Sequence, residues 1–256
     1  MMLSDPWQAL RGLTPARIAL GRAGASLPTT ALLEFQLAHA RARDAVGHVA
    51  DLDAVKRALH SAGFASLRAH SAAEDRDTYL RRPDLGRRLD ETSREALRTR
   101  RVDHDVELCL VIADGLSGVA VERHAAPLAV ALARRLAEEG WRLAPLVVVR
   151  HGRVAIGDEI GELLGAALVA VLIGERPGLS APDSLGVYLT WNPRVGRTDA
   201  ERNCVSNIRP DGLPVPLAAD RLCWLLRESR RRRVSGVALK DDYGAREISG
   251  RTSTTP

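Results

Sequence analysis

The chain has little cysteine and few aromatic residues. Its 256 residues include three cysteines, two phenylalanines and three tyrosines. The odd number of cysteines, with no Cys-x-x-Cys pair and no His-flanked spacing, argues against a disulfide scaffold and against a structural zinc site. This cysteine usage fits a reducing compartment, so we expect a cytoplasmic location.

Long apolar runs are also lacking. Arg, Asp, Glu or Gly interrupts every hydrophobic stretch well before the roughly 18–20 residues that a membrane-spanning helix needs. No apolar segment follows a basic start, which argues against a secretory signal. Hydrophobic residues still make up 45% of the chain, which is enough for a sizeable core. The composition therefore predicts a globular protein that needs no membrane.

Lysine is nearly missing, because Lys56 and Lys240 are the only lysines among 37 basic residues. The net charge of +5 is spread over the whole chain, and an arginine bias reflects coding composition as easily as phosphate recognition. Four consecutive arginines at residues 230–233 would point to all sides of a helix, with no interleaved aromatic residue. We interpret them as a solvated helix end and expect no nucleic-acid partner.

Several catalytic motifs are missing as well. The chain has no Gly-x-Gly-x-x-Gly after an expected strand, no Walker-type Gly-Lys-Ser/Thr and no His-Glu-x-x-His. Residues 115–118 fall one residue short of a nucleophile elbow. Asp114 and His124 lie nearby, but a turn at Asp114 and a helix cap at Ser117 explain this segment better than a triad does. We expect neither a catalytic residue nor a metal ligand in this chain.

From residue 102 onward, apolar runs alternate with helical periodicity. Short apolar runs predict strands at 106–113, 146–149, 168–173 and 185–189. Helices are expected at 119–139, 158–164 and 216–233. This order predicts an α/β fold, a Rossmann-like parallel sheet with helices on both faces.

The first hundred residues favour helices instead. A helix that begins at Thr29 or Thr30 would carry Leu32, Leu33 and Leu37 near a 3.6-residue period. The last residues are polar and lack periodicity. We therefore expect a mostly helical N-terminal region at 1–100, an α/β domain at 101–240 and a disordered tail at 241–256.

Ligands in parallel α/β sheets bind at the carboxyl ends of the strands. The expected ligand loops therefore follow Ala113, Val149, Ile173 and Leu189. Glu175 stands out because it lies between a strand and a Pro/Gly turn, where helix packing does not explain a carboxylate. Cys204 lies in a polar stretch, and it either fills a pocket or contacts a ligand.

Gly157, Gly161 and Gly165 lie four residues apart, on one face of an expected helix. Close helix–sheet packing is the favoured interpretation, because glycine permits a close approach. A flat ligand or a partner against this face is the alternative. We interpret the nearby acids Asp158, Glu159 and Glu162 as a solvated first helical turn rather than as a metal site.

Ordered segments along most of the chain, from about residue 5 to residue 237, resemble the small (light) subunit of ethanolamine ammonia-lyase. The segments are residues 21–24 with 29–33, 79–89, 114–117, 151–154, 157–162, 174–179 and 204–208. Each segment is a weak signal, but the ordered set is highly specific.

This resemblance implies an enzyme that converts ethanolamine into acetaldehyde and ammonia with adenosylcobalamin as cofactor. A large catalytic subunit, a barrel that is not present in this chain, would hold ethanolamine and carry most of the radical chemistry. The small subunit would cover the cobalamin at the interface of a hetero-oligomer. The cobalamin-contact positions of the family fall on Val154, Glu175 and Cys204.

The cofactor is expected to keep its own lower base, dimethylbenzimidazole (the base-on form). Proteins that replace this base with a histidine use an Asp-x-His-x-x-Gly loop, and none of the seven histidines fits that pattern. Some family members carry a longer N-terminal segment that targets bacterial microcompartments, so encapsulation is in doubt for this chain. The alternative interpretation is a free-standing α/β protein that binds a nucleotide or another phosphate-bearing ligand.

Overall fold

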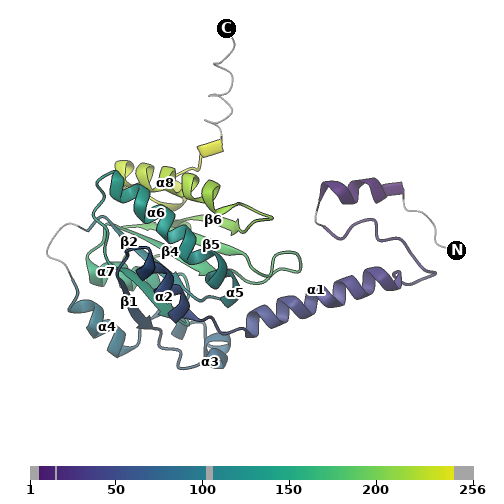
Figure 1. Ribbon diagram of the computed structural model, residues 1–256, viewed down its shortest axis with the longest axis horizontal. Coiled ribbons are helices and arrows are strands. Elements are labelled where there is room, and N and C mark those ends of the chain that lie inside the picture. The colour runs from purple at the N-terminus through teal and green to yellow at the C-terminus, as the bar shows by residue number, and fades with distance from the viewer. Residues whose placement is uncertain (1–5, 15, 102–105, 245–256) are drawn as a thin grey trace, which may run out of the picture.

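The computed structural model describes residues 6–14, 16–101 and 106–244, and its centre is a six-stranded sheet (Figure 1). The strand order across the sheet is β1-β3-β2-β4-β5-β6. The strands are β1 (Ser66–His70), β2 (Leu108–Ala113), β3 (Leu146–Arg150), β4 (Leu168–Gly174), β5 (Leu185–Trp191) and β6 (Arg202–Ile208). The sheet thus draws strands from both sides of residue 100.

The last two strands of the sheet reverse direction. β1, β3, β2 and β4 are parallel, whereas β5 is antiparallel to β4 and β6 is antiparallel to β5. The α/β class is confirmed, but the expectation of an all-parallel sheet is wrong at this end. Segment 175–184 between β4 and β5 contains no helix. A parallel return needs a crossover of about a dozen or more residues, usually with a helix.

Two strands were not predicted from the sequence. β1 lies in the region expected to be mostly helical, and only Ala69 in it is buried. β6 reads as a polar stretch because exposed and buried residues are mixed along it. Both strands lie at the edges of the sheet, where one neighbour is missing and an apolar run is not required. The expected tail lies mostly outside the described residues, which end at Gly244.

Helices cover both faces of the sheet, as predicted. Along β2, Leu108, Leu110 and Ile112 join one core, and the alternate residues Cys109 and Val111 join the other. The first core holds α2 (Leu52–Ser61), α6 (Ala126–Glu138) and α8 (Val215–Arg232), and the second holds residues of α4 (Glu91–Arg98) and α7 (Ile156–Leu164). Shorter elements are η1 (Pro6–Leu13), α3 (Arg76–Arg81), η2 (Leu85–Arg87), α5 (Gly118–Ala120), η3 (Val121–Ala125), η4 (Asp199–Glu201) and η5 (Gly236–Ala238).

The helix expected at 119–139 is interrupted by a π-helical segment. Ser117 caps it, as predicted, by accepting from the Ala120 amide at 3.2 Å. α5, the π segment η3 and α6 then follow one another without a break. Pro127, in the first turn of α6, has no amide hydrogen and its ring crowds the preceding turn. A wider π turn before it relieves that conflict.

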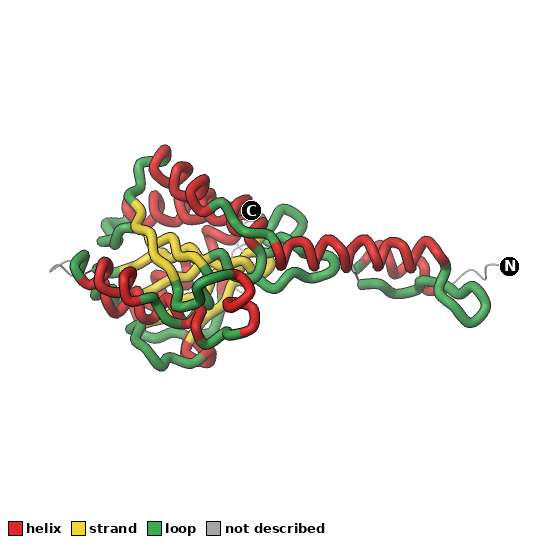
Figure 2. The backbone as a smooth tube through the Cα atoms, turned by 90° about the horizontal axis from the view of Figure 1, so that it is seen from below, coloured by secondary structure: helices red, strands yellow, loops and turns green. Residues whose placement is uncertain are grey.

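The helix expected around Leu32, Leu33 and Leu37 forms, but it does not pack on the sheet. α1 (Thr29–Gly47) extends away from the body together with η1, and Ala45 is its one buried residue (Figures 1 and 2). Leu33 is 57% exposed and Leu37 is 53% exposed. At its base, Arg76 donates to the Val46 carbonyl from both Nε and Nη2. We call described residues up to Gly47 the arm.

The arginines at residues 230–233 are exposed, as predicted for a solvated helix end, but three of them also have partners within the protein. Arg230 lies over the Trp141 ring, 4.5 Å from its centroid, and pairs with Glu107. Arg231 pairs with Glu228, and Arg232 donates to a backbone carbonyl. Arg230 and Arg231 therefore each have a carboxylate partner within the protein.

The glycines of α7 serve close packing, which confirms the favoured interpretation. A Cβ at Gly157 would overlap the side chain of Val171 on β4, and one at Gly161 would lie 2.6 Å from Pro193 Cγ. Gly165 ends the helix in the left-handed region, with φ at +71°. The helix therefore approaches the sheet more closely than any side chain would allow.

We predict that Gly157→Ala lowers the free energy of unfolding by about 1–3 kcal/mol, the usual cost of an overpacked core. Urea unfolding followed by circular dichroism measures the change. Gly47→Ala is the matched control, because nothing lies within 4 Å of a Cβ at that position of α1. The two variants should differ clearly, and equal stability would contradict the close packing of α7.

Candidate functional site

Three loops that follow strands meet at the carboxyl ends of the parallel strands, as predicted. They follow β2, β3 and β4, and hydrogen bonds join them. The Leu116 amide donates to the Gly174 carbonyl at 2.9 Å, and the Gly152 amide donates to Asp114 Oδ1 at 3.3 Å. The fourth expected loop, after Leu189, lies at the opposite end of the strands because β5 is antiparallel to β4. The start of β5 and the end of β6 replace it here.

Glu175 is held by a set of hydrogen bonds at this end of the strands. Ser206 Oγ donates to its Oε1 at 2.7 Å, the Asn207 amide donates to Oε2 at 3.2 Å, and Ser184 Oγ also donates to Oε2. A Cβ at Gly186 would lie 2.7 Å from Oε1, so only glycine leaves room for this carboxylate across β5. The donors fix the direction of the carboxylate and leave it half-buried.

Val154 lies across a cavity from Glu175. The cavity has a volume of about 500 Å³, and both residues line it together with Tyr79, Arg153 and Tyr188. Val154 is half-buried in the loop between β3 and α7. The structure thus brings two of the three expected site residues into one cavity.

The polar stretch that contains Cys204 forms β6, and Cys204 lies in the middle of this strand rather than in one of the strand-end loops. It pairs with Tyr188 across the antiparallel strands, so the two side chains lie next to each other on one face of the sheet. Desolvation by neighbouring side chains raises the pKa of the Cys204 thiol. The thiol is therefore protonated at neutral pH, and it is suited to contact rather than to nucleophilic attack.

Among the described residues, no helix covers the sheet face that carries Cys204 at β5 and β6, although Thr190 and Arg202 are buried at one end of these strands. Here Cys204 and Ser206 are exposed, whereas Val205 points to the opposite face and is buried. α8 packs on that opposite face, and α7 covers β4 and β2. We call the exposed surface of β5 and β6 the bare face.

A cluster of polar side chains lies beside the cavity, and its members Tyr79 and Arg153 line the cavity wall. Tyr79 stacks on His151 with 5.8 Å between ring centroids, and its hydroxyl donates to the Gly152 carbonyl at 3.2 Å. Burial raises the pKa of Asp114 and lowers the pKa of His151, which favours the neutral forms of both. Arg76 and Arg153 lie over the Tyr79 ring at 5.0 and 4.2 Å from its centroid. This cluster was not predicted from the sequence, although Asp114 directly follows one predicted strand and His151 comes two residues after another.

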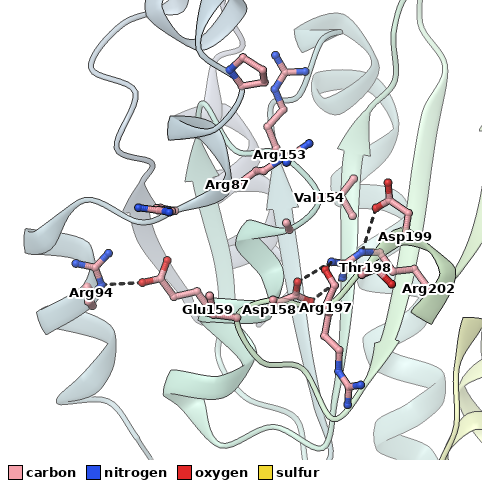
Figure 3. A pocket seen from close by; sticks show the side chains of 15 residues that line it. Arg87, Arg94, Arg153, Val154, Asp158, Glu159, Arg197, Thr198, Asp199 and Arg202 are labelled. Atoms are coloured by element: carbon pink, nitrogen blue, oxygen red, sulfur yellow. Dashed lines mark hydrogen bonds and ion pairs between the residues drawn. The ribbon is translucent and has the colours of Figure 1, made fainter.

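A second cavity, of about 730 Å³, lies beside the first and is rich in arginine (Figure 3). Asp158 accepts two hydrogen bonds from Arg202, at 2.6 and 2.7 Å, and both side chains are 2% exposed. Glu159 accepts from Arg94 Nε at 2.7 Å and from the Leu89 amide at 2.8 Å. The expectation of a solvated first turn at Asp158 and Glu159 is wrong, because basic residues from β6 and α4 pair with them.

Comparison with known proteins gives the family. The family described as "Ethanolamine ammonia-lyase light chain (EutC)" matches residues 4–240. The chain belongs to this family. Membership confirms the resemblance carried by the ordered segments, and it disfavours a free-standing phosphate-ligand protein.

Similar proteins share more than half of their residues with this chain. The "Ethanolamine ammonia-lyase small subunit" of Azotobacter vinelandii is 58% identical over 96% of this chain and 92% of its own length. The protein of the same name from Ralstonia nicotianae is 58% identical over 93% of this chain and 88% of its own length. A third, from Pseudomonas aeruginosa, is 55% identical over 98% and 93%. The light-chain match therefore spans almost the whole chain.

Two further findings concern the described part of this light chain. Within it, no group of three or more His, Cys, Asp or Glu side chains is arranged to hold a metal ion. None of its described helices combines the length and the apolar character that crossing a membrane requires.

Proposed function

We propose that this chain forms one wall of a cobalamin site, with the cofactor held between the bare face and a large catalytic subunit. The observation that carries the proposal is the position of the three family-derived residues. Val154 and Glu175 line one cavity, and Cys204 lies next to it beside Tyr188. A flat cofactor with amide arms fits an uncovered sheet with polar side chains along its rim.

The chemistry of the three side chains suits such a cofactor. The Glu175 carboxylate accepts hydrogen bonds from amide arms or from nucleotide hydroxyls, and the Ser184, Ser206 and Asn207 donors hold it in position. Val154 supplies an apolar wall, and Cys204 supplies a small, polarisable contact. When bound, adenosylcobalamin supplies the radical chemistry, while the protein supplies orientation and exclusion of water.

The residues of the site favour a supporting role over catalysis. Burial raises the pKa of Tyr188, and desolvation raises that of Cys204, so both are protonated at neutral pH. Glu175 is engaged by three donors. We therefore assign the deamination of ethanolamine to the large subunit. The cofactor would keep its dimethylbenzimidazole base, since no histidine of the chain lies in an Asp-x-His-x-x-Gly loop.

The arm supports assembly with a larger partner. Its apolar side chains include Leu33, Phe35 and Leu37, all at least 40% exposed, on a helix that extends into solvent (Figure 2). Apolar surface of this kind is typical of interaction sites. Five arginines and two acids lie between residues 6 and 47, so the arm is basic. We assign it to a contact with an apolar, acid-rimmed surface of the large subunit.

The first test compares the chain alone with the assembled complex. Purified chain with adenosylcobalamin and ethanolamine should release no acetaldehyde, because the sequence carries none of the catalytic motifs considered above and the described site residues suit a supporting role. The co-expressed complex with the large subunit should release acetaldehyde and ammonia. Turnover by the chain alone would contradict the division of roles.

A second prediction concerns Glu175→Gln in the complex. Gln keeps the size but replaces one acceptor oxygen with a donor, so cobalamin binding should weaken by about 1–3 kcal/mol. Equilibrium dialysis with cyanocobalamin measures this change, and gel filtration confirms the subunit content. Glu138→Gln, on the exposed surface of α6, is the matched control. Unchanged affinity in an intact complex would remove Glu175 from the site.

A third prediction concerns the arm. The double variant Leu33→Glu, Leu37→Glu should leave the stability of the free chain unchanged within about 0.5 kcal/mol, because both side chains are exposed. It should raise the dissociation constant from the large subunit at least about tenfold, since charges would be buried at the contact. Gln36→Glu, also exposed on α1, is the control for added charge. Undisturbed assembly, seen by analytical ultracentrifugation, would exclude the arm from the interface.

A further inference from the structure

The arginine-rich cavity contains positive charge that the described part of the protein does not neutralise. Arg202 is paired with Asp158, Arg94 with Glu159, and Arg197 with Glu201. For Arg87, Arg88 and Arg153, by contrast, the described residues supply no carboxylate within ion-pair distance. All three line the cavity. Unpaired arginines that share one cavity indicate an anionic ligand.

Arg153 is fixed in place before any ligand binds. Its guanidinium lies 4.2 Å from the Tyr79 ring centroid, and its Nη2 donates to the Tyr79 carbonyl at 3.0 Å. Its Nε is buried and has no hydrogen-bond partner. A buried donor without a partner is uncommon and costly, so an acceptor that reached this atom would stabilise the folded protein.

The loop that carries Arg87 is locked against the same residue. The Arg153 amide donates to the Gly86 carbonyl at 2.7 Å, and a Cβ at Gly86 would lie 2.8 Å from Arg153 Cγ. Glycine is therefore required for the two loops to touch. This contact brings arginines that are 66 or 65 positions apart in the sequence to one cavity, as Figure 3 shows for Arg87 and Arg153.

The arginine-rich cavity adjoins the proposed cofactor site. Arg153 and Val154 line both cavities. An anion in the arginine-rich cavity would therefore lie beside any molecule on the bare face. A volume of about 730 Å³ is within the usual range for small-molecule sites.

We propose that Arg87, Arg88 and Arg153 form a phosphate-binding site that takes the phosphodiester of the cofactor's nucleotide arm. This inference rests on the proposed cobalamin site and adds the residues that would bind the phosphodiester of the same cofactor. The planar, forked guanidinium groups match the oxygens of a phosphodiester in both charge and geometry. The chain would then recognise the nucleotide arm through arginine, and the corrin ring through Val154 and Cys204.

The test compares two corrinoids on the assembled complex. Cyanocobalamin carries the phosphodiester, and dicyanocobinamide lacks the whole nucleotide arm. Equilibrium dialysis gives a dissociation constant for each with the wild type and with the double variant Arg87→Gln, Arg153→Gln. We expect the variant to weaken cyanocobalamin binding about tenfold or more, as for a lost charged hydrogen bond, with dicyanocobinamide unchanged. Arg134→Gln, exposed on α6, is the control.

The other outcomes overturn the inference in distinguishable ways. An equal loss for both corrinoids would assign the arginines to the corrin ring, and no loss would remove them from the cofactor site. If inorganic phosphate binding were lost while cyanocobalamin binding stayed intact, the ligand would be a free phosphate. Failed assembly of both the double variant and Arg87→Gln alone would mark a subunit contact. If the wild-type complex bound neither corrinoid, the proposed function itself would fail.

Discussion

The short connection between β4 and β5 is the constraint on which the site depends. Segment 175–184 has no helix to cross a face of the sheet, so β5 must return antiparallel, and β6 follows it in the same way. The connection between β4 and β5 therefore places no crossover helix on the sheet face that carries Cys204. Elsewhere the same face is covered by α7 and α4. The reversal of direction both exposes the bare face and brings Ser206 beside Glu175.

A buried ion pair joins the bare end of the sheet to the covered part. Arg202 begins β6 and Asp158 lies in the first turn of α7, and Arg202 also donates to Thr190 Oγ1 at 2.9 Å. Burying two charges costs desolvation, and a two-point pair with further hydrogen bonds offsets that cost. The helix dipole adds to the stabilisation of Asp158. This geometry fixes the bare face without a covering helix.

The chain combines a well-packed body with surfaces that remain unsatisfied. The arm exposes leucines that a free-standing protein would bury, and the arginine-rich cavity retains charges that the described residues do not pair. Both features would be explained by an assembly in which a partner covers the arm and the phosphodiester of the proposed cofactor pairs with the arginines. Membership in a family of light chains agrees with that view.

The central strands β2, β3 and β4 and the helices between them were predictable from the amino-acid sequence, because apolar runs and helical periodicity directly reflect burial on two faces. The ordered segments also indicated the family, and the position of Glu175 between a strand and a Pro/Gly turn marked it as a site residue. Tertiary structure decided what those patterns leave open. Edge strands such as β1 and β6 carry mixed polarity, the direction of β5 depends on a connection rather than on its own residues, and the partners of Asp158 and Arg153 come from distant segments. The site arises from these long-range contacts, and composition and periodicity report only local burial.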